Sequence, residues 1–196
     1  MAFNAYLVFS DDSTIKGEST SDIMVKKGVN AIEVTDFGFG VSMPVTASRS
    51  DGGGATVGRA NFDVFTCSKN IDTATTKLVE FCCKGTAIKK ITLHLFRQGE
   101  GTDDTGVVKY SMVIFKFCVI TKVGISGGGE ELPKESLEFN YGVCEYHYQW
   151  TNHDSGKPSD PGRPSGVDPV MKFSWSTIQN KVLPAEADFQ KCDHSA

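Results

Sequence analysis

The sequence predicts a mainly β fold, a small β-barrel or two-sheet sandwich that carries one α-helix. Most apolar residues alternate with polar ones at a period of two, which is typical of strands. One stretch, residues 71–84, follows helical spacing instead. With 196 residues, of which 39% are hydrophobic and 22% charged, the chain can bury one globular core. We place a single β-barrel domain at residues 1–183 and expect a C-terminal tail at residues 184–196.

Two alternating segments open the chain. Residues 3–9 place their apolar side chains on one face of a strand. Residues 31–41 alternate in the same manner, but their apolar positions change parity partway along. The change of parity predicts a bulge near Thr35–Asp36.

A third strand leads into the helix. Residues 60–67 alternate, with Phe62 and Val64 on one side. The apolar residues of the helix then fall on one face, at positions 71, 74, 78, 81 and 82. Asp72 is suited to cap the helix N-terminus, and Gly85 lies where a glycine commonly ends a helix.

Strand patterns resume after the helix. Residues 91–95 carry apolar side chains at alternate positions, and residues 135–150 and 173–178 predict two further strands. One helix among about eight to ten strands favours a barrel or sandwich capped by that helix.

Residues 107–123 predict a long strand that is apolar on both faces. One face carries Val113, Phe115, Phe117 and Val119, and the other carries Met112, Ile114, Cys118 and Ile120. An antiparallel strand with one wet face alternates cleanly. Both faces therefore need a cover, from a second sheet, the helix or a neighbouring subunit.

No local group of residues indicates an active site or a metal site. Cys144 and His147 have the spacing of a metal pair, but odd spacing on a strand puts them on opposite faces. Cys82 and Cys83 are adjacent on a helix, where their side chains diverge by roughly 100°. Neither run of three glycines precedes the Gly-Lys-Ser/Thr of a phosphate loop. We expect no catalytic residue, no metal and no cofactor, and hence no enzyme.

Charge and cysteine usage restrict the partners and the compartment. The formal net charge is −4 without a Lys/Arg cluster, so nucleic acid is not an expected partner. Charged residues and glycines interrupt every apolar run, so no membrane insertion is expected. The N-terminus lacks the features of a signal peptide. The six cysteines contain no CxxC motif and are expected to be reduced in a protein that folds in the cytoplasm.

Four segments, taken in order, resemble one protein family. They are IKGES at 15–19, FGF at 37–39, FTCSKNID at 65–72, and EFNY at 138–141 followed by Tyr146, Trp175 and Gln179–Asn180. In this order and spacing they resemble the Hcp (haemolysin-coregulated protein) family, the inner-tube proteins of the bacterial type VI secretion system. The resemblance covers about residues 3–182.

The resemblance implies a structural protein. Hcp-like proteins form six-membered rings that stack into a hollow tube, which contraction of a sheath drives out of the cell, and their fold is shared with phage tail-tube proteins. The implied partners are other copies of the chain, the spike and sheath proteins, and effector cargo in the lumen. The implied localisation is the bacterial cytoplasm before firing, then secretion without a cleaved signal peptide. The alternatives are a stand-alone secreted effector or adaptor, or an unrelated ligand-binding β-barrel.

A tube of this kind implies two sites. If Phe37 and Phe39 point into the core, alternation turns Asp36, Gly38 and Gly40 toward the channel, where cargo would lie. A Gly-rich loop is the second site, because it lacks large apolar side chains and should project far enough to reach the adjacent ring. That loop consists of Arg49, Ser50, Asp51, Gly52, Gly53, Gly54, Ala55, Thr56, Val57 and Gly58.

Overall fold

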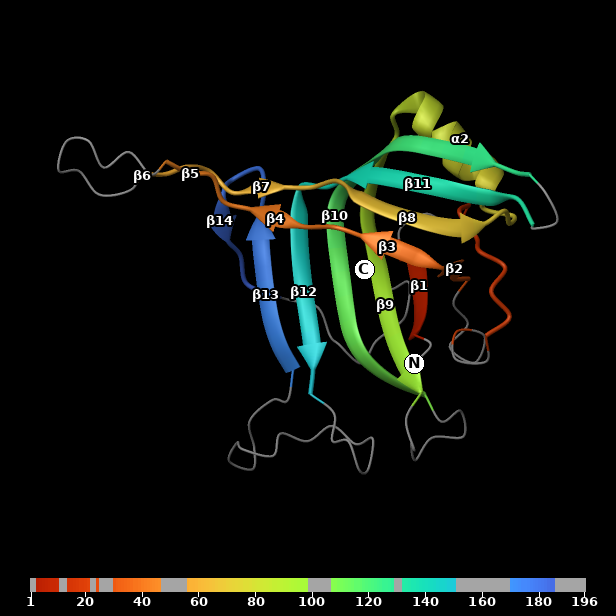
Figure 1. The fold of residues 1–196 in the computed structure, drawn as a ribbon, viewed down its shortest axis with the longest axis horizontal. Coiled ribbons are helices and arrows are strands. Elements are labelled where there is room, and N and C mark those ends of the chain that lie inside the picture. Colours follow the sequence, from red (N-terminus) through yellow and green to blue (C-terminus); the bar gives the residue numbers. More distant parts are fainter. Residues whose placement is uncertain are drawn as a thin grey trace.

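The computed structural model describes residues 3–10, 14–21, 24, 30–46, 56–98, 107–128, 132–150 and 170–185. Across these residues the chain is mainly β, with antiparallel strands and one complete helix (Figure 1). The predicted fold class is therefore confirmed. The strands form one ten-stranded sheet and two small two-stranded sheets.

Ten strands make up the main sheet. In chain order they are β1 (Phe3–Phe9), β2 (Ile32–Val34), β3 (Asp36–Gly38), β8 (Phe65–Asn70), β9 (Ala87–Gln98), β10 (Val107–Ser126), β11 (Lys134–Asn140), β12 (Val143–Gln149), β13 (Val170–Ser176) and β14 (Lys181–Val182). Across the sheet the order is β14–β13–β12–β10–β11–β8–β3, and β9, β1 and β2 branch from β10. Strand β2 pairs with β1 and strand β3 pairs with β8, but β2 and β3 do not pair with each other. The described strands therefore do not form a closed barrel.

The fold has two layers, one with β1, β9, β12 and β13 and the other with β3, β8 and β11 (Figure 1). Strand β10 belongs to both layers. Its first half pairs with β9 and β12, and its second half pairs with β11. Between the two halves, Phe117 has a φ of 57°, a conformation that bulky residues rarely adopt. The alternation shifts there, so Phe117 is 64% exposed while Cys118 and Ile120 face the core. The prediction that Phe117 shares the face of Phe115 is therefore wrong.

Aromatic rings fill the main core between the two layers. The rings of Phe65 and Phe139 stack with their centroids 4.6 Å apart. Phe115 lies 5.1 Å from Phe65 and 4.8 Å from Tyr141, in tilted arrangements that aromatic pairs favour. All four side chains are buried. The alternating apolar residues predicted at 91–95 are buried in the same core, as expected.

The second face of β10 is covered as well. Met112 and Ile114 form a small cluster with Val170 of β13, outside the main core. A further cluster consists of Tyr6, Val8, Met24, Ala31 and Phe96. For Met112 and Ile114 the prediction of two covered faces is confirmed, because both are at most 3% exposed.

The parity change predicted near Thr35–Asp36 is present, but its cause is a crossing between layers rather than a bulge. Strand β2 ends at Val34 and pairs with β1 in one layer. Strand β3 begins at Asp36 and pairs with β8 in the other layer. The Thr35 N–H donates a hydrogen bond to the Ser68 carbonyl at 2.9 Å.

The helix α2 (Thr75–Lys84) begins later than the predicted start at residue 71. Asp72 does not serve as its N-cap residue; it accepts the Ala74 N–H at 3.0 Å in a turn before the helix. Leu78 is buried against the sheet. Gly85 ends the helix as predicted, with a φ of 60° and its N–H donated to the Cys82 carbonyl.

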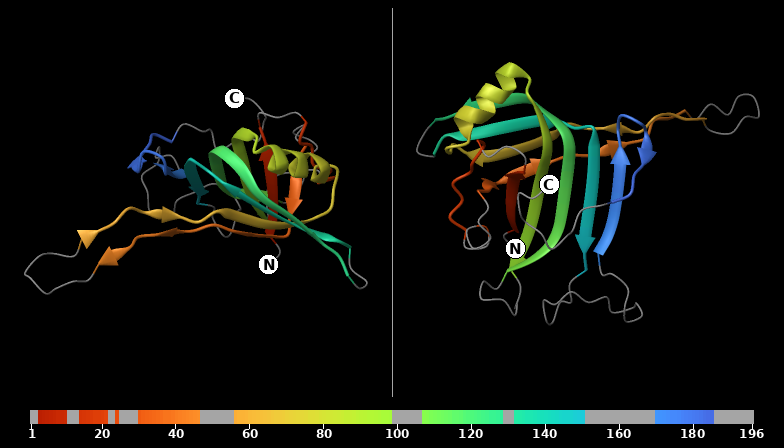
Figure 2. Two further views of the ribbon diagram at one scale, coloured as in Figure 1. Left: turned by 90° about the horizontal axis from the view of Figure 1, so that it is seen from above. Right: turned by 180° about the vertical axis from the view of Figure 1, so that it is seen from behind.

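A two-stranded arm extends away from the body (Figures 1 and 2). It consists of β4 (Val41–Ser42) paired with β7 (Asn61–Phe62), then β5 (Val45–Thr46) paired with β6 (Thr56–Val57). At its base the Phe62 ring stacks on Trp175, with centroids 6.5 Å apart. Arg59 donates hydrogen bonds to the carbonyls that follow β13, those of Thr177 and Ile178.

The strand predicted at residues 60–67 is two strands, because the chain leaves the arm at β7 and enters the body at β8. Between them the Asp63 N–H donates to the Gly40 carbonyl at 3.0 Å. Val64 is exposed. The prediction that it shares a side with Phe62 is therefore wrong.

The strand predicted at residues 135–150 is also divided, into β11 and β12. Gly142 lies at the corner between them, where a Cβ would come within 2.7 Å of Ile178 Cδ1. A side chain at this corner would therefore require the Ile178 side chain to move aside. The strand predicted at residues 173–178 is displaced toward the N-terminus, since β13 begins at residue 170 and ends at Ser176.

Candidate functional site

The candidate site is the outer face of the layer formed by β3, β8, β11 and the second half of β10. Gly38, Thr66, Glu138 and Lys122 form one row across these strands, and Asp36, Ser68, Ser136 and Gly124 form the next. None of the eight is buried. All are small or polar, and we call them the hydroxyl face.

Strict alternation separates this face from the core. The residues between its members in β8 and β11 are apolar and at most 4% exposed: Phe65, Cys67, Leu137 and Phe139. Because successive side chains of a strand point to opposite sides, burying these four fixes the polar ones outward.

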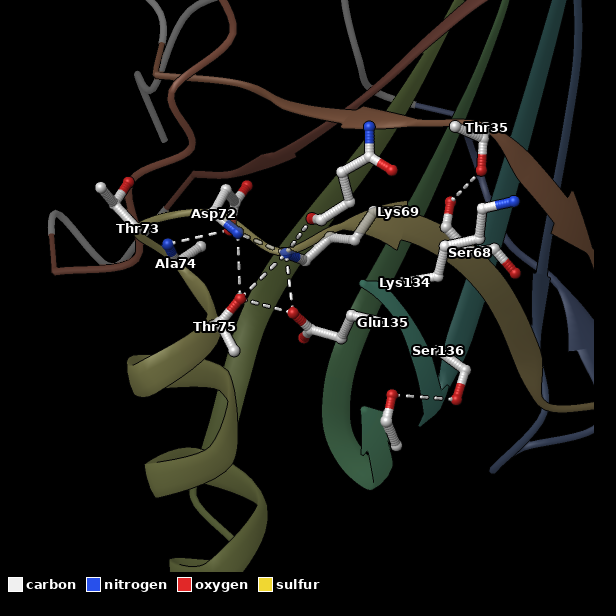
Figure 3. A network of polar contacts seen from close by, with 12 residues as sticks. Thr35, Ser68, Lys69, Asp72, Thr73, Ala74, Thr75, Lys134, Glu135 and Ser136 are labelled. Carbon is white, nitrogen blue, oxygen red and sulfur yellow. Dashed lines mark hydrogen bonds and ion pairs between the residues drawn. The ribbon is translucent and has the colours of Figure 1, made fainter. Parts of the chain in front are cut away.

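Hydroxyl groups on this face bind the backbone of neighbouring strands. Thr66 Oγ1 donates to the Gly38 carbonyl and Ser136 Oγ donates to the Gly124 carbonyl, each at 3.3 Å. Beside them Thr35 Oγ1 donates to the Ser68 carbonyl at 3.0 Å (Figure 3). These hydroxyl side chains lie along the sheet rather than protruding from it. Lys122 and Glu138 add an ion pair to the same face, where the Lys122 side chain is 60% exposed. The face is therefore hydrophilic.

The other side of the layer holds a buried ion pair. Lys69 Nζ lies 2.8 Å from Glu135 Oε2 and 2.7 Å from Asp72 Oδ1 (Figure 3). The side chains of Lys69 and Glu135 are completely buried. Thr75 Oγ1 accepts from Lys69 at 3.3 Å and donates to Glu135 at 2.5 Å. The network thus joins β8, β11 and the first residue of α2.

The predicted lumen residues lie where alternation places them. Asp36 and Gly38 belong to the hydroxyl face, while Phe37 and Phe39 pack against the main core. Gly40 follows β3, and a Cβ there would lie 2.6 Å from Asp63 Oδ2.

The predicted stacking loop lies largely outside the described residues. Residues 49–55 belong to that undescribed part, whereas Thr56 and Val57 form β6. Gly58 donates its N–H to the Pro44 carbonyl at 3.0 Å. The described part of this loop therefore belongs to the strands of the arm.

Sequence reasoning missed the rest of the hydroxyl face. Thr66 and Ser68 alternate with buried residues in β8, and Ser136 and Glu138 do so in β11. The period-two alternation of these residues with buried ones could have identified them as outward-facing. That β3, β8, β11 and β10 lie side by side, so that their polar sides form one surface, depends on pairing between distant segments.

The buried thiols are not suited to nucleophilic chemistry. Burial raises the pKa of Cys67, Cys118 and Cys144 to about 12 in each case. Since the thiolate is the reactive form, these groups are unreactive at neutral pH. They act as small apolar side chains in the main core.

A histidine–carboxylate pair lies on β12, on the side away from Cys144. His147 Nε2 is 2.7 Å from Glu145 Oε1, and Lys116 Nζ is 3.3 Å from Glu145 Oε2. Both side chains of the pair have no exposed surface. A substrate has no access to them in this structure. The prediction that Cys144 and His147 occupy opposite faces is confirmed, because Cys144 packs in the main core.

The described residues contain neither a metal-site cluster nor a membrane-spanning helix. No cluster of three or more histidine, cysteine, aspartate or glutamate side chains there has the arrangement of a metal site. No described helix has the length and apolar character needed to cross a membrane.

Comparison with known proteins gives a consistent family match. A family model described as "Type VI secretion system effector, Hcp" matches residues 6–148. No curated protein matches the chain. Among solved structures, a type six secretion system protein superposes with a TM-score of 0.76 at 24% identity, over 93% of this chain and 100% of the other.

Two further solved structures share the fold. Hcp1 from Salmonella typhimurium superposes with a TM-score of 0.65 at 19% identity, over 93% of this chain and all of that one. A chain in the cryo-EM structure of the anti-feeding prophage baseplate superposes with a TM-score of 0.50 at 9% identity, over 74% of this chain and 91% of the other.

Proposed function

This chain belongs to the Hcp family of type VI secretion system proteins, and we propose that it is the subunit of a tube made of stacked six-membered rings. The family is one of structural secretion proteins, and we propose that this member likewise catalyses no reaction. The tube would be assembled in the bacterial cytoplasm and expelled by the sheath, with the spike at its end.

The hydroxyl face is the observation that carries this proposal. A channel wall that lets folded cargo pass has to be hydrophilic. The four strands present a layer of this kind over an aromatic core. We propose that Asp36, Gly38 and Gly40 line the lumen as part of a wall that also includes Thr66 and Ser136.

The assembly can be tested by native mass spectrometry and negative-stain microscopy of the purified chain. We expect a mass of about six subunits and ring-shaped particles. A monomer at micromolar concentration would contradict the proposal.

A second candidate is a stand-alone secreted effector or adaptor with the same fold, because the matched family is described as a type VI secretion system effector. Secretion from cells with and without the sheath separates the two. A tube subunit requires the sheath both for its own release and for the release of cargo. An effector would be dispensable for the release of other cargo.

A further inference from the structure

The hydroxyl groups on and beside the hydroxyl face all use their protons in the same way. Each donates to a backbone carbonyl within this four-stranded layer, at an oxygen–oxygen distance between 3.0 and 3.4 Å, and Figure 3 draws the bonds of the first and the last in this list: Thr35, Thr66, Ser126 and Ser136. None of the four side chains is buried. The sheet's own carbonyls therefore take the hydroxyl protons on this side.

This direction of hydrogen bonding decides what the face offers to a partner. A hydroxyl group has one proton and two acceptor lone pairs, so a hydroxyl whose proton is donated inward presents acceptors outward. Asp36 is exposed and adds carboxylate oxygens, which only accept hydrogen bonds when ionised. The hydroxyl face is thus rich in acceptors.

The charges of the face favour the same kind of partner. Lys122 is its one cationic member, and the ammonium group lies 2.7 Å from Glu138 Oε1, so that pair is neutral. Asp36 is left as the net charge of the face. Two flanking residues of opposite charge, Asp63 and Lys134, offset one another. Each copy therefore contributes one net negative charge.

Cationic hydrogen-bond donors complement such a surface. Arginine carries five N–H donors and lysine three, and neither side chain has an acceptor. Hydrogen bonds between these groups and a carboxylate are about twice as strong as neutral ones. An acidic partner would bring acceptors to hydroxyl lone pairs and negative charge to Asp36, which selects against it.

We propose that the lumen selects cargo with a basic surface, whose arginine and lysine side chains donate to the hydroxyl and carboxylate oxygens of the hydroxyl face. This inference rests on the proposed tube function, because only a closed ring turns six copies of the face toward one occupant. A wall of one sign of charge around a cleft concentrates ligands of the opposite sign. The repeated Asp36 carboxylates give the ring this property.

Fluorescence anisotropy with designed peptides tests the selectivity. Rings of the full chain, verified by native mass spectrometry, are titrated with three labelled peptides in which serine alternates with arginine, glutamine or glutamate. We expect the arginine peptide to bind at least about tenfold more tightly than the glutamate peptide, with the glutamine peptide between them. Equal binding of the arginine and glutamate peptides would overturn the proposal.

Two charge variants locate the binding. Asp36→Asn removes the net charge of the face and should weaken binding of the arginine peptide by roughly two- to fivefold. Glu33→Gln is the matched control, since Glu33 is also exposed but lies on β2, which pairs with β1 in the other layer. It should leave binding unchanged. Equal losses in the two variants would reveal general attraction of a basic peptide to an acidic chain and would refute the assignment to this face.

A hydroxyl variant tests the acceptors separately from the charge. Thr66→Val removes an acceptor but keeps the shape of the side chain, and should weaken binding of the arginine peptide even at high salt, where charges are screened. Thr76→Val is the control, because Thr76 is likewise exposed but lies on α2. Ser136→Ala provides a second acceptor variant, and circular dichroism verifies folding. Unchanged binding in folded rings of both acceptor variants would contradict the role of the hydroxyl groups.

The outcomes separate this inference from the tube proposal. Six-subunit rings that bind the three peptides alike would overturn the selectivity and leave the tube proposal intact. Monomers in the native mass spectrum would overturn both.

Discussion

Lys69 shows how one residue can join three elements. Its ammonium group lies within 2.8 Å of two carboxylates while its side chain has no exposed surface. Removing two charges from water is unfavourable, so such a group is tolerated only when its partners are in place. The start of α2 and its position on the sheet therefore depend on a network that no local helix signal reveals.

Replacing Lys69 by methionine should destabilise the fold by about 3–5 kcal/mol, because Glu135 is left as a buried, uncompensated charge. Chemical denaturation measures the loss. Lys122→Met is the matched control, since its ion pair with Glu138 is 2.7 Å long but its side chain is 60% exposed. It should change stability by at most about 1 kcal/mol. The double variant Lys69→Met/Glu135→Leu should recover much of the loss, and equal effects of the two lysine substitutions would contradict the argument.

The buried thiols predict a loss of stability at alkaline pH. Their folded pKa of about 12 lies above the ordinary value of 9.0. Above pH 9 the unfolded chain releases thiol protons that the folded chain retains, so the free energy of unfolding falls as pH rises toward 12. Each thiol contributes a slope of up to about 1.4 kcal/mol per pH unit. Urea titrations between pH 8 and 10 measure it. Cys118→Ala should reduce the slope, and a flat profile would contradict the prediction.

At the scale of elements, the four-stranded layer owes its two faces to alternation. Aromatic and aliphatic residues hold one side in the core, while glycines, hydroxyl side chains and charged side chains remain on the other. Thr66 and Ser136 bind backbone carbonyls of adjacent strands, which keeps these two side chains along the sheet. A bulky side chain on this side would therefore project outward without disturbing the core.

The variant Gly38→Trp uses this difference. A Cβ at Gly38 would lie 3.2 Å from Thr66 Oγ1, a side-chain contact that can adjust, so rings should still form. The indole would project into the proposed lumen and reduce cargo retention, which co-purification of cargo with the rings measures. Gly17→Trp is the contrast, because its Cβ would overlap the Ala31 carbonyl oxygen, a backbone atom, and it should lower the unfolding temperature. Loss of rings in Gly38→Trp would place this face in packing instead.

At the scale of the whole molecule, the arm is the part that extends away from the body. Its base is fixed by Phe62 and Arg59, so its direction is set by the body. The Gly-rich loop between β5 and β6 lies outside the described residues. Its proposed contact with the adjacent ring is therefore a prediction from composition and from the direction of the arm.

Deletion of Gly52–Gly54 should abolish tubes and leave six-membered rings, because it shortens the loop without altering the body. Negative-stain microscopy counts tubes, and native mass spectrometry of the same sample verifies the rings. Tubes of normal length in the deletion variant would show that the loop has no part in stacking.

Local patterns predicted most strands and the helix end. Period-two alternation identified β1, β9 and the core-facing residues of β11, and Gly85 marked the end of α2. Errors arose where the chain changes partner. At Phe117 the alternation shifts, at Asp63 one strand becomes two, and at Gly142 the chain turns a corner.

The sequence by itself determined the β class, the alternation that makes Asp36 and Gly38 polar-side residues, and the ordered motifs of the Hcp family. Only the tertiary structure decided that four distant strands join into one hydroxyl face, that Lys69 and Glu135 meet beneath it, and that hydroxyl groups of this face donate their protons to backbone carbonyls of neighbouring strands. The physical reason is the sequence range over which the deciding interactions act. Side-chain direction in a strand follows from the two-residue repeat, whereas the pairing of segments up to about a hundred residues apart is decided by how all their buried faces pack at once.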